Sequence, residues 1–497
     1  MDLRAAAAGA LAARLSPRYL EEHCLIPLGL EDDSTLTAAA GMPLDPTVLD
    51  ELSRIFERPV RVVPVEAAEI RAALLAARPA APADTETIAP APDDAAAVAV
   101  GDLRALANEA PVIQFVNVML LDALKAGASD VHVESTTEGL RVRMRLDGVL
   151  RDISTLGKAH QSGILSRIKL LAGLDIAERR VPQDGRARLA LADREVDLRV
   201  STLPSIYGES AVVRLLDHST TARGLAELGL SAELEARFDR LIHRPTGLIL
   251  VTGPTGSGKT TTLYAALGRV NGAAVKILTV EDPVEYRLAG ITQIPVNRRA
   301  GLGFGSALRS MLRHDPDIIM VGEMRDRETA EIAVQAALTG HLVLSTLHTN
   351  DAVGGITRLV DMGIEPYLVS ATVEAILAQR LVRVLCDACA EPIQPTPAEL
   401  ATAPASVAKR IDRRFRRPRG CEACSGTGYR GRRGIYELFV PTERIRARVA
   451  QGAALDELRA LARDDGLITL REAAWEAART GLTSIAEVLR VTAADEQ

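Results

Sequence analysis

The chain has 497 residues, of which 47% are hydrophobic, and a formal net charge of −6. That length allows about three domains with separate cores, and the hydrophobic share excludes a mostly disordered protein. The acidic balance and an aromatic content of 3% disfavour a general nucleic-acid binder. We expect a cytoplasmic multidomain protein, because no apolar run reaches transmembrane length and the CxxC cysteine pairs indicate a reducing compartment.

The first predicted unit, residues 1–78, is a small helix-rich head. Short apolar clusters broken by prolines predict a compact module, and no residue in it suggests chemistry. Residues 79–100 follow, rich in proline, alanine and acidic residues and without helical or strand period. That composition is typical of a semi-extended linker.

The second predicted unit, residues 101–218, is an α/β domain with a mostly antiparallel sheet. Apolar residues alternate with arginines in LRVRMRLDGVL, and the same period of two recurs in REVDLRVSTLP and ESAVVRLLD. The arginine rows allow two interpretations, which are a solvated face and a surface that meets an anion.

The third predicted unit, residues 222–382, alternates apolar strands with helical stretches. The strand candidates are LILVT, AVKILTV, IIMVG and HLVLSTL. Such apolar strands are typical of a parallel sheet that is buried on both faces, and these sheets bind ligands at the carboxyl ends of their strands.

The turn after LILVT has the phosphate-loop pattern GxxxxGK[ST] and is followed by a helix. Its glycines let backbone N–H groups converge on phosphate oxygens, and the helix N-terminus adds partial positive charge. Lys259 would reach the β and γ phosphates, and Thr260 would ligate Mg²⁺. We expect a nucleoside triphosphate on Gly253, Pro254, Thr255, Gly256, Ser257, Gly258, Lys259, Thr260 and Thr261.

Carboxylates and histidines follow three other strands of this unit. Glu323 comes after IIMV, where a carboxylate can orient or deprotonate water, and the aspartate usual at this strand end is absent. Glu281 follows ILTV and is either a catalytic or metal-associated group or a helix cap. His341 and His348 flank HLVLSTL; beside a nucleotide, His348 indicates a sensor of the γ phosphate, and His341 is a weaker candidate.

Two CxxC pairs separated by 31 residues predict a zinc-binding insert over residues 383–440. Four thiolates complete a tetrahedral structural site, with redox or unliganded thiols as the alternative. The predicted zinc ligands are Cys386, Cys389, Cys421 and Cys424.

Within the insert, residues 409–420 form the basic run KRIDRRFRRPRG. It is either a solvated helix or a contact for anionic lipid headgroups, with nucleic acid as a third possibility. Residues 441–497 are predicted to form a C-terminal helical bundle.

Four stretches of the third unit resemble, in order, the boxes of the secretion ATPases of bacterial type II and type IV pilus systems. They are GPTGSGKTTTLYAAL, ILTVEDPVEY, DPDIIMVGEMRD and TGHLVLSTLHTN. The resemblance extends from about residue 101 to the C-terminus through ASDVHVES, RMRLDGVLRD, AERRVPQDGR and STLPSIYGES. It implies a RecA-like ATPase domain that binds ATP and Mg²⁺, hinged near residues 217–223 to a PAS-like domain.

The resemblance also implies roles for single residues. The family forms hexamers in which arginines of the domain at 101–218 approach a neighbour's γ phosphate, and Arg199 and Arg214 are the candidates here. The residues that match the family's catalytic groups are Lys259, Thr260, Glu281, Glu323, His341 and His348.

The tetracysteine insert resembles that of the extension or assembly branch of the family, and the length, single head and C-terminal sequence favour type II secretion. The resemblance implies a homohexamer that drives pseudopilus assembly through an inner-membrane platform. Residues 1–78 would bind that platform's cytoplasmic domain, and the chain would be peripheral on the inner membrane. The alternatives are a type IV pilus extension ATPase, a RecA-type nucleic-acid translocase and a non-enzymatic zinc scaffold.

Overall fold

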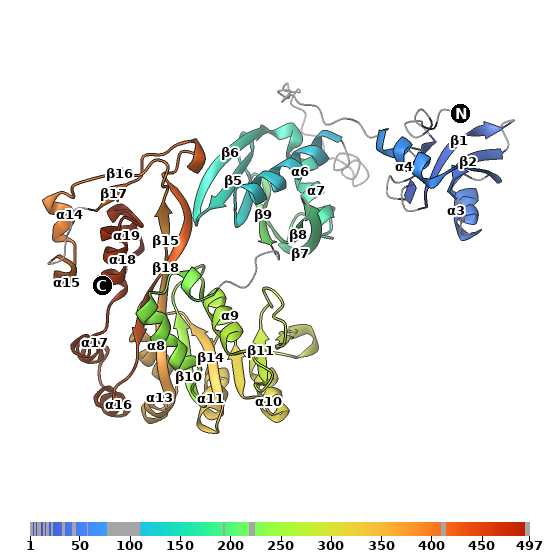
Figure 1. The fold of residues 1–497 in the computed structure, drawn as a ribbon. Helices are drawn as coiled ribbons and strands as arrows, with labels where there is room; N and C mark the ends of the chain where they lie inside the picture. Colours follow the sequence, from blue (N-terminus) through green and yellow to red (C-terminus); the bar gives the residue numbers. More distant parts are fainter. Residues whose placement is uncertain are drawn as a thin grey trace. The chain divides into compact units, whose positions relative to one another are not determined.

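The computed structural model divides the chain into two compact units, Met1–Pro90 and Ala91–Gln497 (Figure 1). The predicted linker, residues 79–100, lies outside the described residues. Apart from isolated positions before residue 23, the structure describes residues 23–31, 35–41, 46–56, 58–76, 110–191, 194–217, 224–408 and 414–492.

The first unit contains a sheet that the prediction of a helix-rich head missed. β2 pairs antiparallel with β1 and parallel with β3. Alanine is depleted in strands, so TLTAAA gives little strand signal, yet Leu36 and Ala40 of this strand are buried in the core of the unit. The strands and helices are β1 (Leu25–Glu31), β2 (Thr35–Ala40), α3 (Pro46–Phe56), β3 (Val60–Pro64) and α4 (Ala67–Ala76).

The domain that follows the linker is an antiparallel sheet with helices packed on it, as predicted. Its strand order is β6-β5-β4-β9-β8-β7, and every neighbouring pair is antiparallel. The elements are α6 (Ala110–Lys125), β4 (Asp130–Ser135), β5 (Gly139–Leu146), β6 (Val149–Gly157), α7 (Gln161–Leu171), β7 (Gln183–Leu191), β8 (Arg194–Ser205) and β9 (Gly208–Asp217).

The arginine row of β5 forms cross-strand ion pairs. Arg141 lies 2.7 Å from Asp152 of β6, and Arg143 pairs with Glu134 of β4. These arginines already face carboxylates of their own sheet, which favours the solvated-face interpretation of the row.

The sheet of the third predicted unit has seven strands in the order β12-β11-β13-β14-β10-β15-β18. All neighbouring pairs are parallel except β15 and β18. The predicted boundary between residues 382 and 383 falls inside β15, and β18 returns from the cysteine insert to complete the sheet. The strands are β10 (Gly247–Thr252), β11 (Ile277–Glu281), β12 (Thr292–Pro295), β13 (Ile318–Val321), β14 (Leu342–Leu347), β15 (Val373–Leu385) and β18 (Tyr429–Phe439).

Both faces of this sheet are buried, which explains its apolar strands. In β10, Leu248 and Leu250 pack in one core cluster, whereas Ile249 and Val251 pack in the other. The cluster that contains Ile249 and Val251 also contains residues of α8 (Ala232–Ile242) and α9 (Lys259–Val270). The cluster that contains Leu248 and Leu250 also contains residues of several helices. Among them are α10 (Phe304–Met311), α11 (Arg327–Leu338), α12 (Gly354–Asp361), α13 (Pro366–Thr372) and the C-terminal helices α16 (Glu443–Ala450), α17 (Leu455–Asp464), α18 (Leu470–Arg479) and α19 (Ile485–Thr492).

The described part of the basic run is not the predicted solvated helix; residues 409–413 lie outside the described residues. Phe415 is 1% exposed and packs edge-on against Trp475 at 6.3 Å between ring centroids. Arg417 lies 3.0 Å from Glu391, across the short β16–β17 ladder. The insert contains β16 (Glu391–Pro392), α14 (Pro397–Ala401), α15 (Ala405–Ala408) and β17 (Arg416–Arg417).

None of the described helices has both the length and the apolar character that crossing a membrane requires.

Replacing Phe415 by alanine should destabilise the C-terminal region, because the change leaves a cavity beside Trp475. We expect Phe415→Ala to lower its free energy of unfolding by about 3–5 kcal/mol. Trp475 is the chain's single tryptophan, so its fluorescence during urea unfolding reports on this region. The control is Tyr367→Ala, which removes a side chain that is 59% exposed and should change stability by less than about 0.5 kcal/mol. Equal effects of the two substitutions would mean that packing of Phe415 against Trp475 does not stabilise this region.

Candidate active site

The register of three parallel strands brings several of the predicted site residues to one edge of the sheet. Thr252 of β10 is paired with Leu347 of β14, and Val321 of β13 with Ser345 of β14. The phosphate loop, Glu323 and His348 therefore all follow strands at the same carboxyl edge, where open α/β sheets bind ligands.

The phosphate loop has no room for side chains at two of its glycines. Gly253 has a φ of 145°, and a Cβ there would lie 2.4 Å from the carbonyl oxygen of Gln379. Gly258 has a φ of 88°, and a Cβ would lie 2.9 Å from Nε2 of Gln379. Gln379 of β15 also accepts a hydrogen bond from Thr262 at 2.7 Å. This glutamine braces the loop, and sequence reasoning missed it because it lies on a strand distant in the chain.

The donors of the loop suit a phosphate chain. Ser257 Oγ is buried and has no hydrogen-bond partner among the described residues, which leaves a hydroxyl that a phosphate oxygen could accept from. Lys259 Nζ donates to the carbonyl oxygens of Gly253 and Pro254 at 2.8 and 3.1 Å. Burial lowers the pKa of Lys259 to about 8, and the nearby Glu323 carboxylate opposes that shift. A bound phosphate would supply the compensating charge that this buried amine lacks.

The other residues of the loop lie at its surface or at the start of α9. Pro254, Thr255 and Gly256 are exposed, whereas Thr260 and Thr261 are half-buried in the first turn of the helix.

Glu323 and His348 lie close together beside Lys259. Nε2 of His348 is 4.0 Å from Oε2 of Glu323, and the same oxygen is 2.7 Å from Nε of Arg325. Burial and the positive charge of Lys259 lower the pKa of His348, so this imidazole is neutral at pH 7. Arg325 is a further cation of the site; it lies two residues after Glu323, and sequence reasoning did not single it out.

The loop that carries His348 is tied to the start of the phosphate loop. Thr252 Oγ1 lies 2.7 Å from Thr349 Oγ1 and accepts a hydrogen bond from the Thr349 N–H at 2.9 Å. On its other side, Asp351 forms an ion pair with Arg459 of α17 at 2.6 Å. The histidine loop therefore touches both the nucleotide-binding strand and the C-terminal helices.

Within this chain His341 lies away from the other site residues, so its role stays a prediction. It precedes β14, at the amino end of the strand, whereas His348 follows the carboxyl end. Its Nδ1 lies 3.0 Å from the carbonyl oxygen of Ala336. The motif contains both histidines, but a buried strand separates them.

Glu281 ends β11 at the same edge but is 2% exposed, with its carboxylate engaged inside the domain. The predicted arginines are also paired within the chain. Arg199 lies 3.2 Å from Glu285 of the acidic turn, and Arg214 lies 2.9 Å from Asp130.

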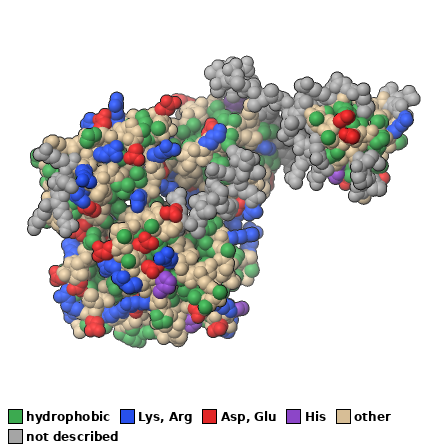
Figure 2. Space-filling model, in the orientation of Figure 1, with side chains coloured by type: hydrophobic (Ala, Val, Ile, Leu, Met, Phe, Trp, Pro, Cys, Tyr) green, Lys and Arg blue, Asp and Glu red, His purple; other side chains and the backbone are tan. Residues whose placement is uncertain are grey.

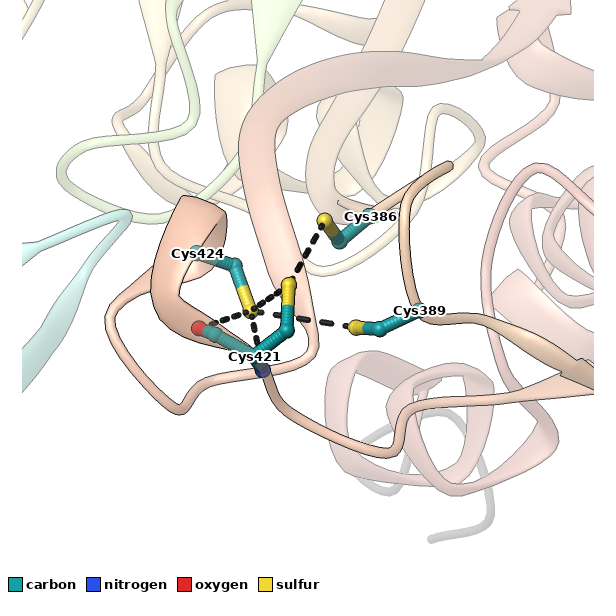
Figure 3. Close-up of side chains that lie close together, drawn as sticks. All are labelled: Cys386, Cys389, Cys421 and Cys424. Carbon is teal, nitrogen blue, oxygen red and sulfur yellow. Dashed lines mark hydrogen bonds between the residues drawn. The ribbon is translucent and has the colours of Figure 1, made fainter.

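The four insert cysteines form a compact cluster (Figure 3). Three of the Sγ–Sγ distances are 3.9, 3.8 and 3.7 Å, for Cys386–Cys421, Cys389–Cys424 and Cys421–Cys424. Tetrahedral Zn²⁺ with Zn–S bonds of about 2.3 Å requires sulfur separations of about 3.8 Å, so the cluster fits this ion. Burial opposes ionisation of Cys424, but backbone N–H groups of Cys421 and Gly428 outweigh it and lower the pKa of this thiol to about 6.

Comparison with known proteins agrees with this arrangement. Residues 105–490 match the family model of the type II/IV secretion system protein, and residues 1–83 match that of the MshEN domain. The type II secretion system protein E of Pseudomonas aeruginosa is 50% identical over 391 residues, which cover 79% of this chain and 77% of that protein. The type II secretion system ATPase E of Vibrio cholerae is 49% identical over 404 residues, with coverage of 79% and 77%.

Solved structures share the fold of the second unit. The pilus retraction motor PilT with bound ADP has a TM-score of 0.53 and 26% identity, covering 76% of this chain and 96% of that one. The Legionella pneumophila ATPase DotB, at 21% identity and a TM-score of 0.56, covers 77% of this chain and 96% of its own and supports the fold alone. With its phosphate loop and strand-end carboxylate, the chain belongs to the type II/IV secretion system protein family and is an ATP-hydrolysing member of it.

Proposed function

We propose that this chain is the motor ATPase of a type II secretion machine and works as a homohexamer. The observation that carries the proposal is the meeting of Lys259, Glu323 and His348 at one sheet edge, in a chain whose relatives are type II secretion proteins at 50% and 49% identity. ATP hydrolysis at this edge would supply the energy for pseudopilus assembly.

In this mechanism Glu323 is the general base. Its carboxylate follows β13 and would accept the proton of the attacking water, while Lys259 binds the phosphate oxygens. Neutral His348 would donate a hydrogen bond to the γ phosphate. Thr260 would hold Mg²⁺, which neutralises phosphate charge when it is bound.

We assign Arg199 and Arg214 as the cations that a neighbouring subunit receives. In one chain both are held by carboxylates, Arg199 by Glu285 and Arg214 by Asp130. In the assembled oligomer these arginines would leave their carboxylate partners and pair with the γ phosphate of the ATP bound in the next subunit. The site would therefore be complete only in the oligomer.

The remaining roles follow from the domain order. Movement of the domain at 101–218 against the domain at 222–382 would transmit the work of hydrolysis. Residues 1–78 would bind the cytoplasmic domain of the inner-membrane platform and hold a cytoplasmic chain at that membrane. We also propose that Cys386, Cys389, Cys421 and Cys424 bind a structural Zn²⁺, supported by their sulfur separations.

The first test separates type II secretion from type IV pilus extension. Titration calorimetry would compare the full chain with a chain lacking residues 1–78, against the cytoplasmic domains of the type II and pilus platform proteins. We expect the full chain to prefer the type II component by at least about tenfold, and the truncated chain to bind neither. Preference for the pilus component would leave the catalytic roles intact and assign the motor to the other machine.

A nucleic-acid translocase has less support. Basic and acidic side chains are interspersed over the second unit in the view of Figure 2. The whole chain also has a net charge of −6, which disfavours binding to a polyanion such as nucleic acid.

Replacing Glu323 by glutamine should abolish hydrolysis without abolishing nucleotide binding, because the amide keeps the shape but cannot accept the proton. We expect Glu323→Gln to lower kcat by about 10²- to 10⁴-fold, measured as phosphate release, with nucleotide affinity within about threefold of wild type. The control is Glu331→Gln on α11, an exposed partner of Arg327 that should leave kcat unchanged. Near-wild-type turnover in Glu323→Gln would remove the general-base assignment.

Zinc content tests the cysteine cluster. The purified chain should contain about one zinc ion per chain by atomic emission, and Cys424→Ser should lose most of it and expose the insert to proteolysis. Cys24→Ser, which changes the cysteine outside the cluster, is the matched control. A chain that folds with no zinc and is insensitive to Cys424→Ser would overturn the zinc assignment.

A further inference from the structure

Beneath the acidic turn, residues 282–288, lies a buried hydrogen-bonded group that the mechanism above does not use. We call it the Tyr264 cluster; it consists of Tyr264 of α9, Thr279 and Glu281 of β11, and Gln293 of β12. Tyr264 is 0% exposed and Glu281 is 2% exposed. The cluster therefore connects the helix that begins with Lys259 to the strand that leads into the acidic turn.

Both oxygens of the Glu281 carboxylate accept hydrogen bonds from the other members of the cluster. Oε2 accepts a hydrogen bond from the Tyr264 hydroxyl. Oε1 accepts from Thr279 Oγ1 at 2.6 Å and from Gln293 Nε2 at 3.1 Å. A buried carboxylate is stable only with such donors, and these three donors leave Glu281 directed into the domain.

The Tyr264 hydroxyl is held as a donor. Burial and the adjacent Glu281 carboxylate raise the pKa of Tyr264 above its usual range, so the hydroxyl keeps its proton. Replacing Tyr264 by phenylalanine would leave Glu281 with one donor fewer in a site that water does not reach, which is a costly change.

The same tyrosine also holds the acidic turn. Its oxygen accepts the backbone N–H of Glu285 at 3.3 Å, and its ring packs edge-on against Tyr286 at 4.6 Å between centroids. Gln293 adds two bonds to the turn, accepting the Leu288 N–H at 2.7 Å and donating to the Tyr286 carbonyl at 3.1 Å. The turn is thus attached to the phosphate-loop helix by side chains and not by the strand alone.

We propose that Tyr264 is a positioning residue for ATP hydrolysis, acting through Glu281 to hold the acidic turn against the phosphate-loop helix. On this view Glu281 is the centre of a structural connection and does not touch the nucleotide. The turn presents Glu285 to Arg199, so the connection also links the phosphate loop to the domain at 101–218. The inference depends on ATP hydrolysis by this chain and not on the general-base role of Glu323.

The first experiment measures steady-state hydrolysis by the full chain carrying Tyr264→Phe. We expect kcat to fall about tenfold while KM for ATP stays within about twofold, because the turn is displaced but the phosphate cradle is not. The matched control is Tyr436→Phe, a buried tyrosine of the same core cluster whose hydroxyl donates to the Leu228 carbonyl at 3.1 Å. This variant should lower the melting temperature by a similar amount and leave kcat unchanged.

A double-substitution cycle with Glu281→Gln tests whether Tyr264 acts through Glu281. We expect Tyr264→Phe and Glu281→Gln each to lower kcat about tenfold, and the two together to lower it by no more than about twentyfold. Multiplied effects, near one-hundredfold, would show that the residues act separately and would overturn the proposal.

Three other results would also overturn it. They are wild-type kcat in Tyr264→Phe, an equal loss of kcat in Tyr436→Phe, and a loss of about one-hundredfold or more in Glu281→Gln, which would mean that Glu281 takes part in the chemistry. If Tyr264→Phe does not fold, the Glu281→Gln result alone decides between positioning and chemistry. Loss of the general-base assignment through Glu323→Gln would leave this cycle intact, so the two proposals fail separately.

Discussion

The parallel pairing of β10, β14 and β13 is the constraint on which the active site depends. Because these strands lie in register, the segments that follow them emerge side by side, and Lys259, Glu323 and His348 meet although they are far apart in the chain. A slip of one residue would move each strand end by about 3.3 Å and exchange its two faces. Both faces of this sheet pack in core clusters, so the packing of the whole domain opposes such a slip.

Strands β15 and β18 connect this edge to the rest of the second unit. Gln379 of β15 fills the space that two phosphate-loop glycines leave. Glu437 of β18 is 3% exposed and accepts the backbone N–H groups of Ala352, beside the histidine loop, and Leu470, at the start of α18. A rearrangement of the histidine loop would therefore strain contacts with the C-terminal helices. The cysteine insert is the segment of chain between β15 and β18.

Local sequence predicted the parts of the site whose chemistry is contained in a short motif. The phosphate loop needs glycines at set positions, and Glu323 and His348 each come within two residues of the end of an apolar strand, so their places at the sheet edge were predictable. His341 lies apart from these residues within one chain, because its motif spans a whole strand whose two ends lie at opposite edges of the sheet. The direction of the Glu281 side chain depended on Tyr264 and Gln293, which other elements supply.

The sequence by itself determined the alternation of apolar strands and helices, the phosphate loop, the strand-end carboxylate and the four cysteines, because each is encoded by local period or spacing. Only the tertiary structure decided which buried side chains meet. The head sheet, the return of β18 to the ATPase sheet, the burial of Phe415 inside a basic run and the pairing of Arg199 with Glu285 all join distant segments. Such contacts depend on packing and charge compensation between elements, which no single stretch of sequence contains.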